Sequence, residues 1–269
     1  MINKNQVVRR FGRSSTSYDE HAVVQKHMAA TLQALLHKTG VFNRILEIGC
    51  GTGGLTKMLA ALYPQASILA TDISPDMLAA AQDNLSDFTN IRYAVEDGEQ
   101  LQTRETFDLI VSNATFQWFN NHRQSYTGFF KRLSANGCLA YATFGPQTFY
   151  ELHQSFATAN HLLNSQCDIR HGQHFPAALK LQRSMEDAGF QDVLCTEEEL
   201  REYFPTVKDF LRSVKKVGAN NTNYDGSISR QLMFTMMGYY EQNFKEHDHI
   251  HATYHTIYAL GRKSVNINR

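Results

Sequence analysis

The chain has 269 residues, 42% of them hydrophobic, and this length fits one α/β domain that carries a helical insertion. Its 26 lysine and arginine residues balance 26 aspartate and glutamate residues, which argues against a protein that binds nucleic acid by charge alone. Cys50, Cys138, Cys167 and Cys195 form no CxxC pair, and no apolar run reaches the roughly 20 residues of a membrane span. The first residues also lack the apolar stretch of a secretory signal. We therefore expect a cytoplasmic monomer with free thiols, no metal, and no nucleic-acid or membrane partner.

The hydrophobic pattern predicts one amphipathic helix followed by strands that alternate with helices. The first helix is expected over residues 18–36. The strands expected next are 44–48, 67–71, 91–95, 107–112 and 137–144, and the helices between them are 55–62, 75–85 and 126–133. Buried strands separated by helices predict a parallel sheet that is covered on both faces.

The second half is less regular and predicts a helix over 177–188, a strand over 192–200 and a last strand over 249–260. Between these strands, residues 205–244 are too many for a hairpin, and we expect a helical insertion that forms part of a lid. A helical decoration that only covers the sheet is the open alternative.

The sequence thus predicts one Rossmann-like α/β domain with a seven-stranded, mostly parallel sheet and helices on both faces. Its parts are an N-terminal helical cap (1–40), the core (41–200), the insertion or lid (205–245) and the final strand (246–262).

A glycine-rich segment follows the first strand, from Glu47 to Gly54. Glycines at this place allow a tight turn and a close approach of a ligand to the backbone. Gly49, Gly51 and Gly54 also match the dinucleotide fingerprint GxGxxG, which is weak evidence alone. Polar residues then end or follow three further strands in order: Asp72, Asp97 and Asn113.

Several carboxylates around one ligand favour a cofactor with positive charge. S-adenosylmethionine has a sulfonium and an ammonium group and no phosphate, whereas a nicotinamide dinucleotide carries a pyrophosphate that prefers a helix N-terminus. We therefore expect S-adenosylmethionine, with S-adenosylhomocysteine as its product. The residues expected to bind it are Glu47, Gly49, Cys50, Gly51, Gly53, Asp72, Ile73, Met77, Asp97, Gly98, Asn113 and Phe116.

These motifs resemble those of class I methyltransferases. More narrowly, the chain resembles the malonyl-acyl-carrier-protein O-methyltransferase family of biotin synthesis. The resembling segments are Arg10-Phe11, Ser17-Tyr18-Asp19, Ala22 to Gln25, Ile45 to Gly53, Ser112 to Trp118, Thr143 to Gly145, Phe210 to Arg212, and Lys216 to Ala219.

The resemblance implies methyl transfer from the cofactor to the free carboxylate of a malonyl group on acyl carrier protein. A carboxylate is already ionised at neutral pH, so alignment and exclusion of water should suffice without a general base. The first helix closes over the cofactor in the resembling family, which makes Tyr18, at its start, the best candidate near the reacting centre. Gln117, Trp118 and Phe144 are expected to wall the pocket, and a buried arginine is expected to pair with the substrate carboxylate.

An acidic carrier protein with a malonyl-phosphopantetheine arm should dock on a basic surface. Arg212, Lys215 and Lys216 share one face of the expected insertion helix, and Arg9, Arg10 and Arg13 form a second cluster.

Three other readings remain open. They are a methyltransferase for another small acid (trans-aconitate type) or small metabolite, a protein of this fold that binds cofactor without catalysis, and an NAD-dependent dehydrogenase. His249, His251 and His255 fall on one face of the last strand, which we interpret as a polar strand face rather than a metal site.

Overall fold

A computed structural model describes residues 1–15, 17–164, 175–217 and 228–264. Cys167, Gly218 and Ala219 lie outside these ranges, while Cys50, Cys138 and Cys195 are free thiols. Within the described ranges, no helix has both the length and the apolar character needed to cross a membrane.

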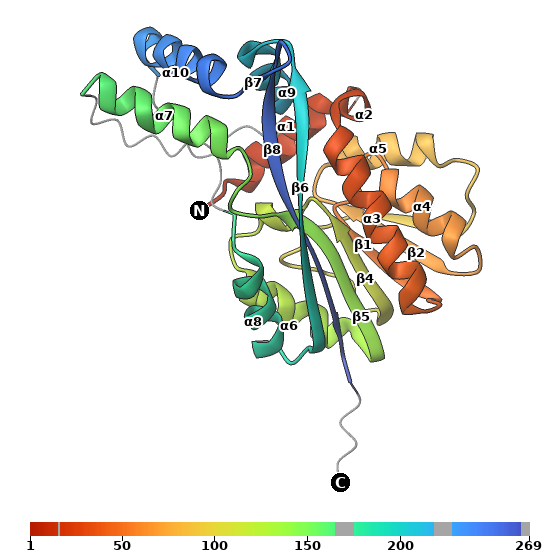
Figure 1. Ribbon diagram of the computed structural model, residues 1–269. Helices are drawn as coiled ribbons and strands as arrows, with labels where there is room; N and C mark the ends of the chain where they lie inside the picture. The colour runs from red at the N-terminus through yellow and green to blue at the C-terminus, as the bar shows by residue number, and fades with distance from the viewer. Residues whose placement is uncertain (16, 165–174, 218–227, 265–269) are drawn as a thin grey trace.

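The sheet follows the order β3-β2-β1-β4-β5-β8-β6 (Figure 1). Its strands are β1 (Arg44–Ile48), β2 (Ser67–Asp72), β3 (Ile91–Val95), β4 (Phe107–Asn113), β5 (Leu133–Phe144), β6 (Gln191–Phe204) and β8 (His249–Arg262). The first five pair in parallel, and β8 runs antiparallel to both β5 and β6. This path has the seven strands that the sequence predicts, and a two-residue strand, β7 (Lys245–Glu246), adds an eighth beside β8.

Helices cover both faces because successive residues of each strand point to opposite sides. In β1, Ile45 packs in the core under α3 (Val23–Thr39), α4 (Gly54–Leu62) and α5 (Pro75–Asn84). Its neighbour Leu46 packs in the other core, under α6 (His122–Arg132) and α8 (Ala178–Asp187). Both side chains are fully buried, so β1 contributes to the cores on both faces of the sheet.

The N-terminal region differs from the single helix expected over 18–36. Ala22 has φ −85° and ψ 46°, which ends a short helix α2 (Tyr18–His21) before α3 begins. Val23, counted toward the apolar face, is 55% exposed. A further helix, α1 (Lys4–Ser14), precedes both and is capped by the Asn3 side chain, which accepts from the Gln6 N–H. The cap therefore has three helices.

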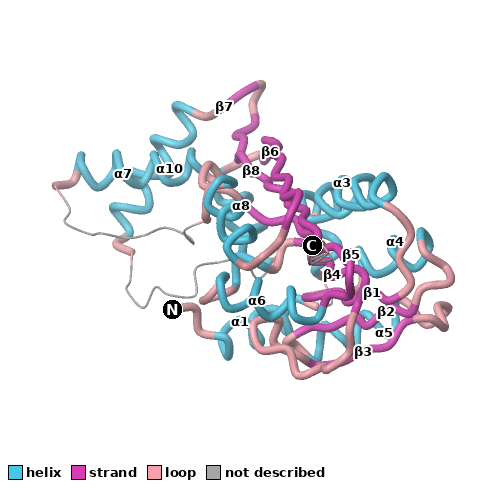
Figure 2. The backbone as a smooth tube through the Cα atoms, turned by 90° about the horizontal axis from the view of Figure 1, so that it is seen from below, coloured by secondary structure: helices cyan, strands magenta, loops and turns pink. Residues whose placement is uncertain are grey.

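The insertion contains α9 (Val207–Lys216) and α10 (Arg230–Asn243), and α10 packs against α7 (Tyr150–Leu162), a helix that the sequence reading missed. Figures 1 and 2 both show α7 and α10 side by side beyond one end of the sheet. The strand expected over 192–200 is longer, because Gln191–Phe204 pairs along the length of β8.

The histidine row on β8 is not a polar surface face. His249 is exposed, but His251 and His255 are buried, and acidic side chains meet both of them. The Nε2 of His251 lies 3.4 Å from Oε1 of Glu151 on α7, and the Nε2 of His255 lies 2.8 Å from Oε2 of Glu197 on β6. The neighbouring elements therefore cover this face and place a carboxylate beside each buried imidazole.

The turn after β1 depends on glycine. Gly49 has φ +69°, and a Cβ there would lie 2.1 Å from Oγ1 of Thr115 in the segment after β4. Gly54 has ordinary backbone angles as the first residue of α4, and a Cβ there would meet nothing within 4 Å. A side chain at Gly49 would therefore be strained and would clash, whereas one at Gly54 would meet neither problem.

We predict that Gly49→Ala lowers the free energy of unfolding by about 1–3 kcal/mol, because it combines left-handed strain with a clash. Gly54→Ala, the matched control in the same segment, should be neutral or stabilising by up to about 1 kcal/mol. Urea unfolding of both variants measures the difference. Equal losses of stability would contradict the assignment of Gly49 as a conformational requirement.

Candidate active site

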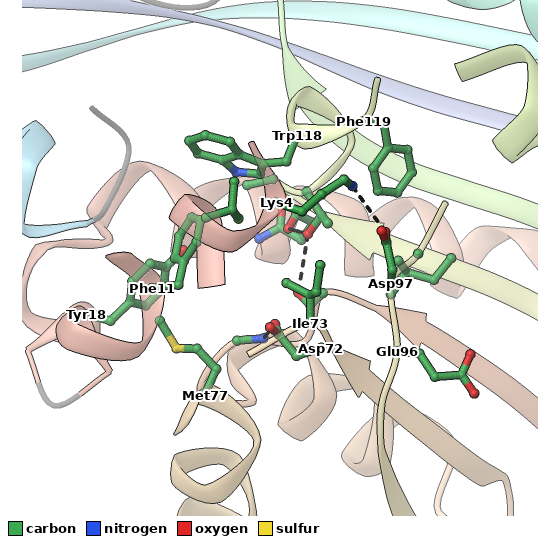
Figure 3. Close-up of a pocket in the computed structure, with 18 residues that line it drawn as sticks. Lys4, Phe11, Tyr18, Asp72, Ile73, Met77, Glu96, Asp97, Trp118 and Phe119 are labelled. Carbon is green, nitrogen blue, oxygen red and sulfur yellow. Dashed lines mark hydrogen bonds and ion pairs between the residues drawn. The ribbon is translucent and has the colours of Figure 1, made fainter. Parts of the chain in front are cut away.

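A pocket with about 620 Å³ of open space lies beyond the carboxyl ends of β1, β2 and β4, where open α/β sheets bind ligands (Figure 3). Its walls come from α1, the start of α2, the end of β1 with the turn that follows, and the segments at and after the ends of β2, β3 and β4. The described residues that line it are Lys4, Val7, Phe11, Tyr18, Ile48, Gly49, Gly51, Asp72, Ile73, Met77, Glu96, Asp97, Gly98, Asn113, Ala114, Thr115, Trp118 and Phe119.

The carboxylate of Asp72 holds the floor of the pocket together. Its Oδ2 accepts from the Gly51 N–H at 2.9 Å, and its Oδ1 accepts from the Ser74 N–H at 2.8 Å. Burial raises the pKa of Asp72, and these backbone donors oppose that shift. Asp72 therefore fixes the glycine turn against the start of α5 while facing the pocket.

At the other end of the pocket, Asp97 pairs with a residue of the N-terminal helix. Lys4 Nζ lies 3.1 Å from Oδ1 of Asp97 and 2.6 Å from Oε2 of Glu99, and it stands 5.2 Å above the Phe119 ring. Figure 3 shows Lys4 reaching over the pocket to Asp97. This pairing ties α1 across the pocket as one of its walls.

Glu47 lies behind the pocket and not in its described lining. It is 1% exposed, and its Oε2 has no hydrogen-bond partner among the described residues. Burial, assisted by the negative charge of Asp72, raises the pKa of Glu47 to about 7. A positive ligand in the adjacent pocket would favour the ionised form of Glu47.

Tyr18, the candidate nearest the reacting centre, lines the pocket from the start of α2. Its ring centroid lies 6.4 Å from that of Phe11. The next residue, Asp19, accepts a hydrogen bond from the Thr52 hydroxyl at 2.7 Å, which joins α2 to the glycine turn. Burial and the nearby carboxylates of Asp72 and Asp19 raise the pKa of Tyr18. Its hydroxyl therefore stays protonated, so it can form hydrogen bonds but does not act as a base.

The pocket brings together eight of the twelve residues expected to bind cofactor. These are Gly49, Gly51, Asp72, Ile73, Met77, Asp97, Gly98 and Asn113. The other four, Glu47, Cys50, Gly53 and Phe116, do not line it in the described structure. Phe116 departs furthest from the expectation, because it is fully buried and stacks on Tyr141 with ring centroids 4.1 Å apart.

A second pocket, with about 400 Å³ of open space, adjoins the first and shares Trp118 with it. The predicted wall residues Gln117, Trp118 and Phe144 all line it. The other described lining residues are Gln25, Thr148, Phe149, Phe175, Val214, Val217 and Tyr254. This described lining has no lysine, arginine or histidine, so the buried arginine expected for the substrate carboxylate is not found there.

Helix α9 joins the second pocket to the surface. Val214 and Val217, at its C-terminal end, line the pocket. Arg212, Lys215 and Lys216, predicted to share one helix face, are exposed on the same helix. The helix therefore places a basic surface beside an apolar pocket wall.

Sequence reasoning missed the α1 residues Lys4, Val7 and Phe11. The signal was present, since Asn3 is a good N-cap and Val7 and Phe11 are spaced by one helical turn. Residues of the second pocket such as Phe149 and Tyr254 come from distant parts of the chain, and their meeting depends on the packing of α7 and β8.

The raised pKa of Glu47 predicts a pH-dependent stability. Below about pH 4.5 the carboxyl is protonated in both states and has no effect. Between pH 4.5 and 7 the unfolded chain ionises first, so folding is destabilised, by about 3 kcal/mol at pH 7.5. We expect the free energy of unfolding of the native protein to fall relative to Glu47→Gln over this range. Urea unfolding at several pH values tests it, and parallel pH curves would contradict it.

Comparison with known proteins shows close relatives along the whole chain. A methyltransferase domain family model matches residues 45–137. A malonyl-acyl-carrier-protein O-methyltransferase of Bacillus anthracis is 40% identical over 263 residues, which cover 96% of this chain and 97% of the relative. The protein of the same name from Acetivibrio thermocellus is 38% identical and covers 100% of this chain and 97% of the relative.

Solved structures show the same fold at low sequence identity. The YcgJ protein from Bacillus subtilis has a TM-score of 0.62 at 14% identity, covering 88% of this chain and 100% of that one. The N-methyltransferase NodS from Bradyrhizobium japonicum, solved with S-adenosylhomocysteine, has a TM-score of 0.56 at 16% identity, covering 96% and 98%. The full-length relatives show that this chain belongs to the malonyl-acyl-carrier-protein O-methyltransferase family.

Proposed function

We propose that this protein transfers the methyl group of S-adenosylmethionine to the free carboxylate of a malonyl group on acyl carrier protein. Two of its relatives are named malonyl-acyl-carrier-protein O-methyltransferases, which supports this proposal. The observation that carries the proposal is the pair of adjoining pockets. The lining of the first includes the carboxylates of Asp72, Glu96 and Asp97. The described lining of the second is apolar or uncharged, and Trp118 belongs to both.

The first pocket suits a cofactor with positive charge. Asp72 and Asp97 line it, and Oδ1 of Asn113 is buried there without a partner among the described residues. In our proposal Asp72 accepts hydrogen bonds from the ribose hydroxyls, and Asp97 accepts from the adenine amino group. Asn113 Oδ1 is free to accept from the ammonium group. When bound, S-adenosylmethionine supplies a methyl group on a positively charged sulfur.

The residues around the reacting centre align and enclose the reactants, and none needs to act as a base. Tyr18 keeps its proton and can only orient a reactant through a hydrogen bond. Phe11 and Trp118 meet edge to face with ring centroids 5.3 Å apart, and so exclude water where the two pockets adjoin. Alignment and desolvation can then supply the rate enhancement.

The second pocket suits the acyl end of a carrier-bound substrate. Its described lining is apolar or neutral, which favours a thioester and the adjoining arm over a free diacid with two charges. Helix α9 exposes Arg212, Lys215 and Lys216 beside this pocket, and in our proposal an acidic carrier protein docks on them.

The test is methyl transfer from labelled S-adenosylmethionine to malonyl-acyl carrier protein, run beside malonyl-coenzyme A, free malonate and trans-aconitate. We expect label on the malonyl carboxylate of the carrier protein and little on the free acids. Preferred labelling of trans-aconitate or free malonate would replace the carrier protein with a small acid as substrate.

The same assay tests docking. Reversing two charges with Lys215→Glu and Lys216→Glu should lower kcat/KM for malonyl-acyl carrier protein about tenfold, because rim charges steer association. The rate with a short malonyl thioester that lacks the carrier should stay unchanged. Lys57→Glu, on exposed Lys57 of α4, is the matched control and should change neither rate. Equal effects on both substrates would show that α9 does not dock the carrier.

A further inference from the structure

We propose that the acceptor carboxylate is held by two neutral donors, the indole N–H of Trp118 and the side-chain amide of Gln25, at the junction of the two pockets. The proposal rests on the proposed function and names the groups that recognise its reacting end. Gln25 and Trp118 both line the second pocket, and Trp118 also lines the first.

The first observation is an unpaired donor. Trp118 is 6% exposed, and its Nε1 is buried without a hydrogen-bond partner in the part of the chain that the structure describes. A buried N–H without an acceptor costs about 1–3 kcal/mol, so its presence needs a reason. In Figure 3 the indole nitrogen lies on the ring edge that faces the other lining residues. A ligand acceptor at this place would satisfy it.

The second observation is the fixed position of Gln25. The Asn113 amide donates to the backbone oxygen of Gln25 at 2.9 Å, which ties the start of α3 to the end of β4. Asn113 lines the first pocket and Gln25 the second, so this bond joins the two walls. Within the described part of the chain the Gln25 side chain makes no hydrogen bond, so its amide is available to a ligand in the second pocket.

Gln117, the other amide in the second pocket, is occupied. Its Nε2 donates to the Ala114 backbone oxygen at 2.7 Å, and its Oε1 accepts from the Thr143 hydroxyl at 3.3 Å. Lys4, in the first pocket, is occupied by Asp97 and Glu99. These contacts favour Trp118 and Gln25 as the donors for a substrate carboxylate.

Neutral donors also fit the change of charge in the reaction. A carboxylate oxygen forms a bond to the methyl carbon, the sulfur–methyl bond breaks, and its electron pair stays on sulfur. No proton moves, and an anion and a sulfonium become a neutral ester and a neutral thioether. The sulfonium itself is the counter-charge of the carboxylate, whereas a buried arginine would be left unpaired once the ester forms.

The test compares variants that remove one donor each. Trp118→Phe keeps an aromatic ring against Phe11 but removes the N–H, and Gln25→Leu keeps the side-chain size but removes the amide. We expect each to lower kcat/KM for malonyl-acyl carrier protein about 10- to 100-fold, the effect of losing a hydrogen bond to a charged group. Gln25→Glu should lower it further, because it places a like charge beside the carboxylate.

Affinity measurements distinguish loss of a hydrogen bond to the carboxylate from a general disturbance of the pocket. Affinity for S-adenosylhomocysteine should be unchanged in the Gln25 variants. Affinity for the methyl ester of the malonyl carrier, which has no negative acceptor, should be unchanged in all variants. The control Gln82→Glu, at an exposed position of α5 and outside both described linings, should keep full activity.

If the native protein transfers methyl groups normally and Trp118→Phe and Gln25→Leu do too, the carboxylate assignment is wrong and the proposed function stands. Equal weakening of ester and carboxylate binding also overturns the assignment. Absence of transfer by the native protein overturns both proposals.

Discussion

The hydrogen bond from the Gly51 N–H to Asp72 Oδ2 is the constraint on which the site depends, because it joins the turn after β1 to the end of β2. The turn requires left-handed backbone angles at Gly49, Gly51 and Gly53, and Asp72 holds the turn from outside. Its other oxygen accepts from Ser74, the N-cap of α5. One carboxylate thus sets the floor of the first pocket and the start of a helix, and still faces the ligand space.

This arrangement also places two acidic side chains, Glu47 and Asp72, in a buried environment. Burial raises the pKa values of both Glu47 and Asp72. The negative charge of Asp72 raises the pKa of Glu47 further, whereas backbone N–H donors partly oppose the shift at Asp72. Such a site favours a cationic ligand, because positive charge offsets the desolvation of the acids. Lys4 partly fills this role at Asp97, and it does so from the N-terminal helix. The ion pair between Lys4 and Asp97 therefore both offsets negative charge and holds α1 over the pocket.

The sequence predicted the parts of the fold that repeat a local pattern. Strand β1 was predicted with its observed bounds, and the ends of β2 and β4 placed Asp72 and Asn113 at the pocket. The break at Ala22 was missed because Val23 and its neighbours kept the apolar spacing of a helix, although Val23 faces solvent. Phe116 was misplaced because a residue after a strand end can turn into the core as well as toward the ligand. The second pocket depends on contacts between distant segments, which local periodicity does not encode.

The central claim is that the two pockets are the donor and acceptor halves of one reaction site. The most direct measurement is a crystal structure with S-adenosylhomocysteine and a malonyl-pantetheine analogue bound together. We expect the homocysteine sulfur in the first pocket, facing the malonyl carboxylate across Trp118, with the pantetheine arm leaving past α9. A malonyl group bound elsewhere, with Trp118 and Gln25 away from its carboxylate, would contradict it.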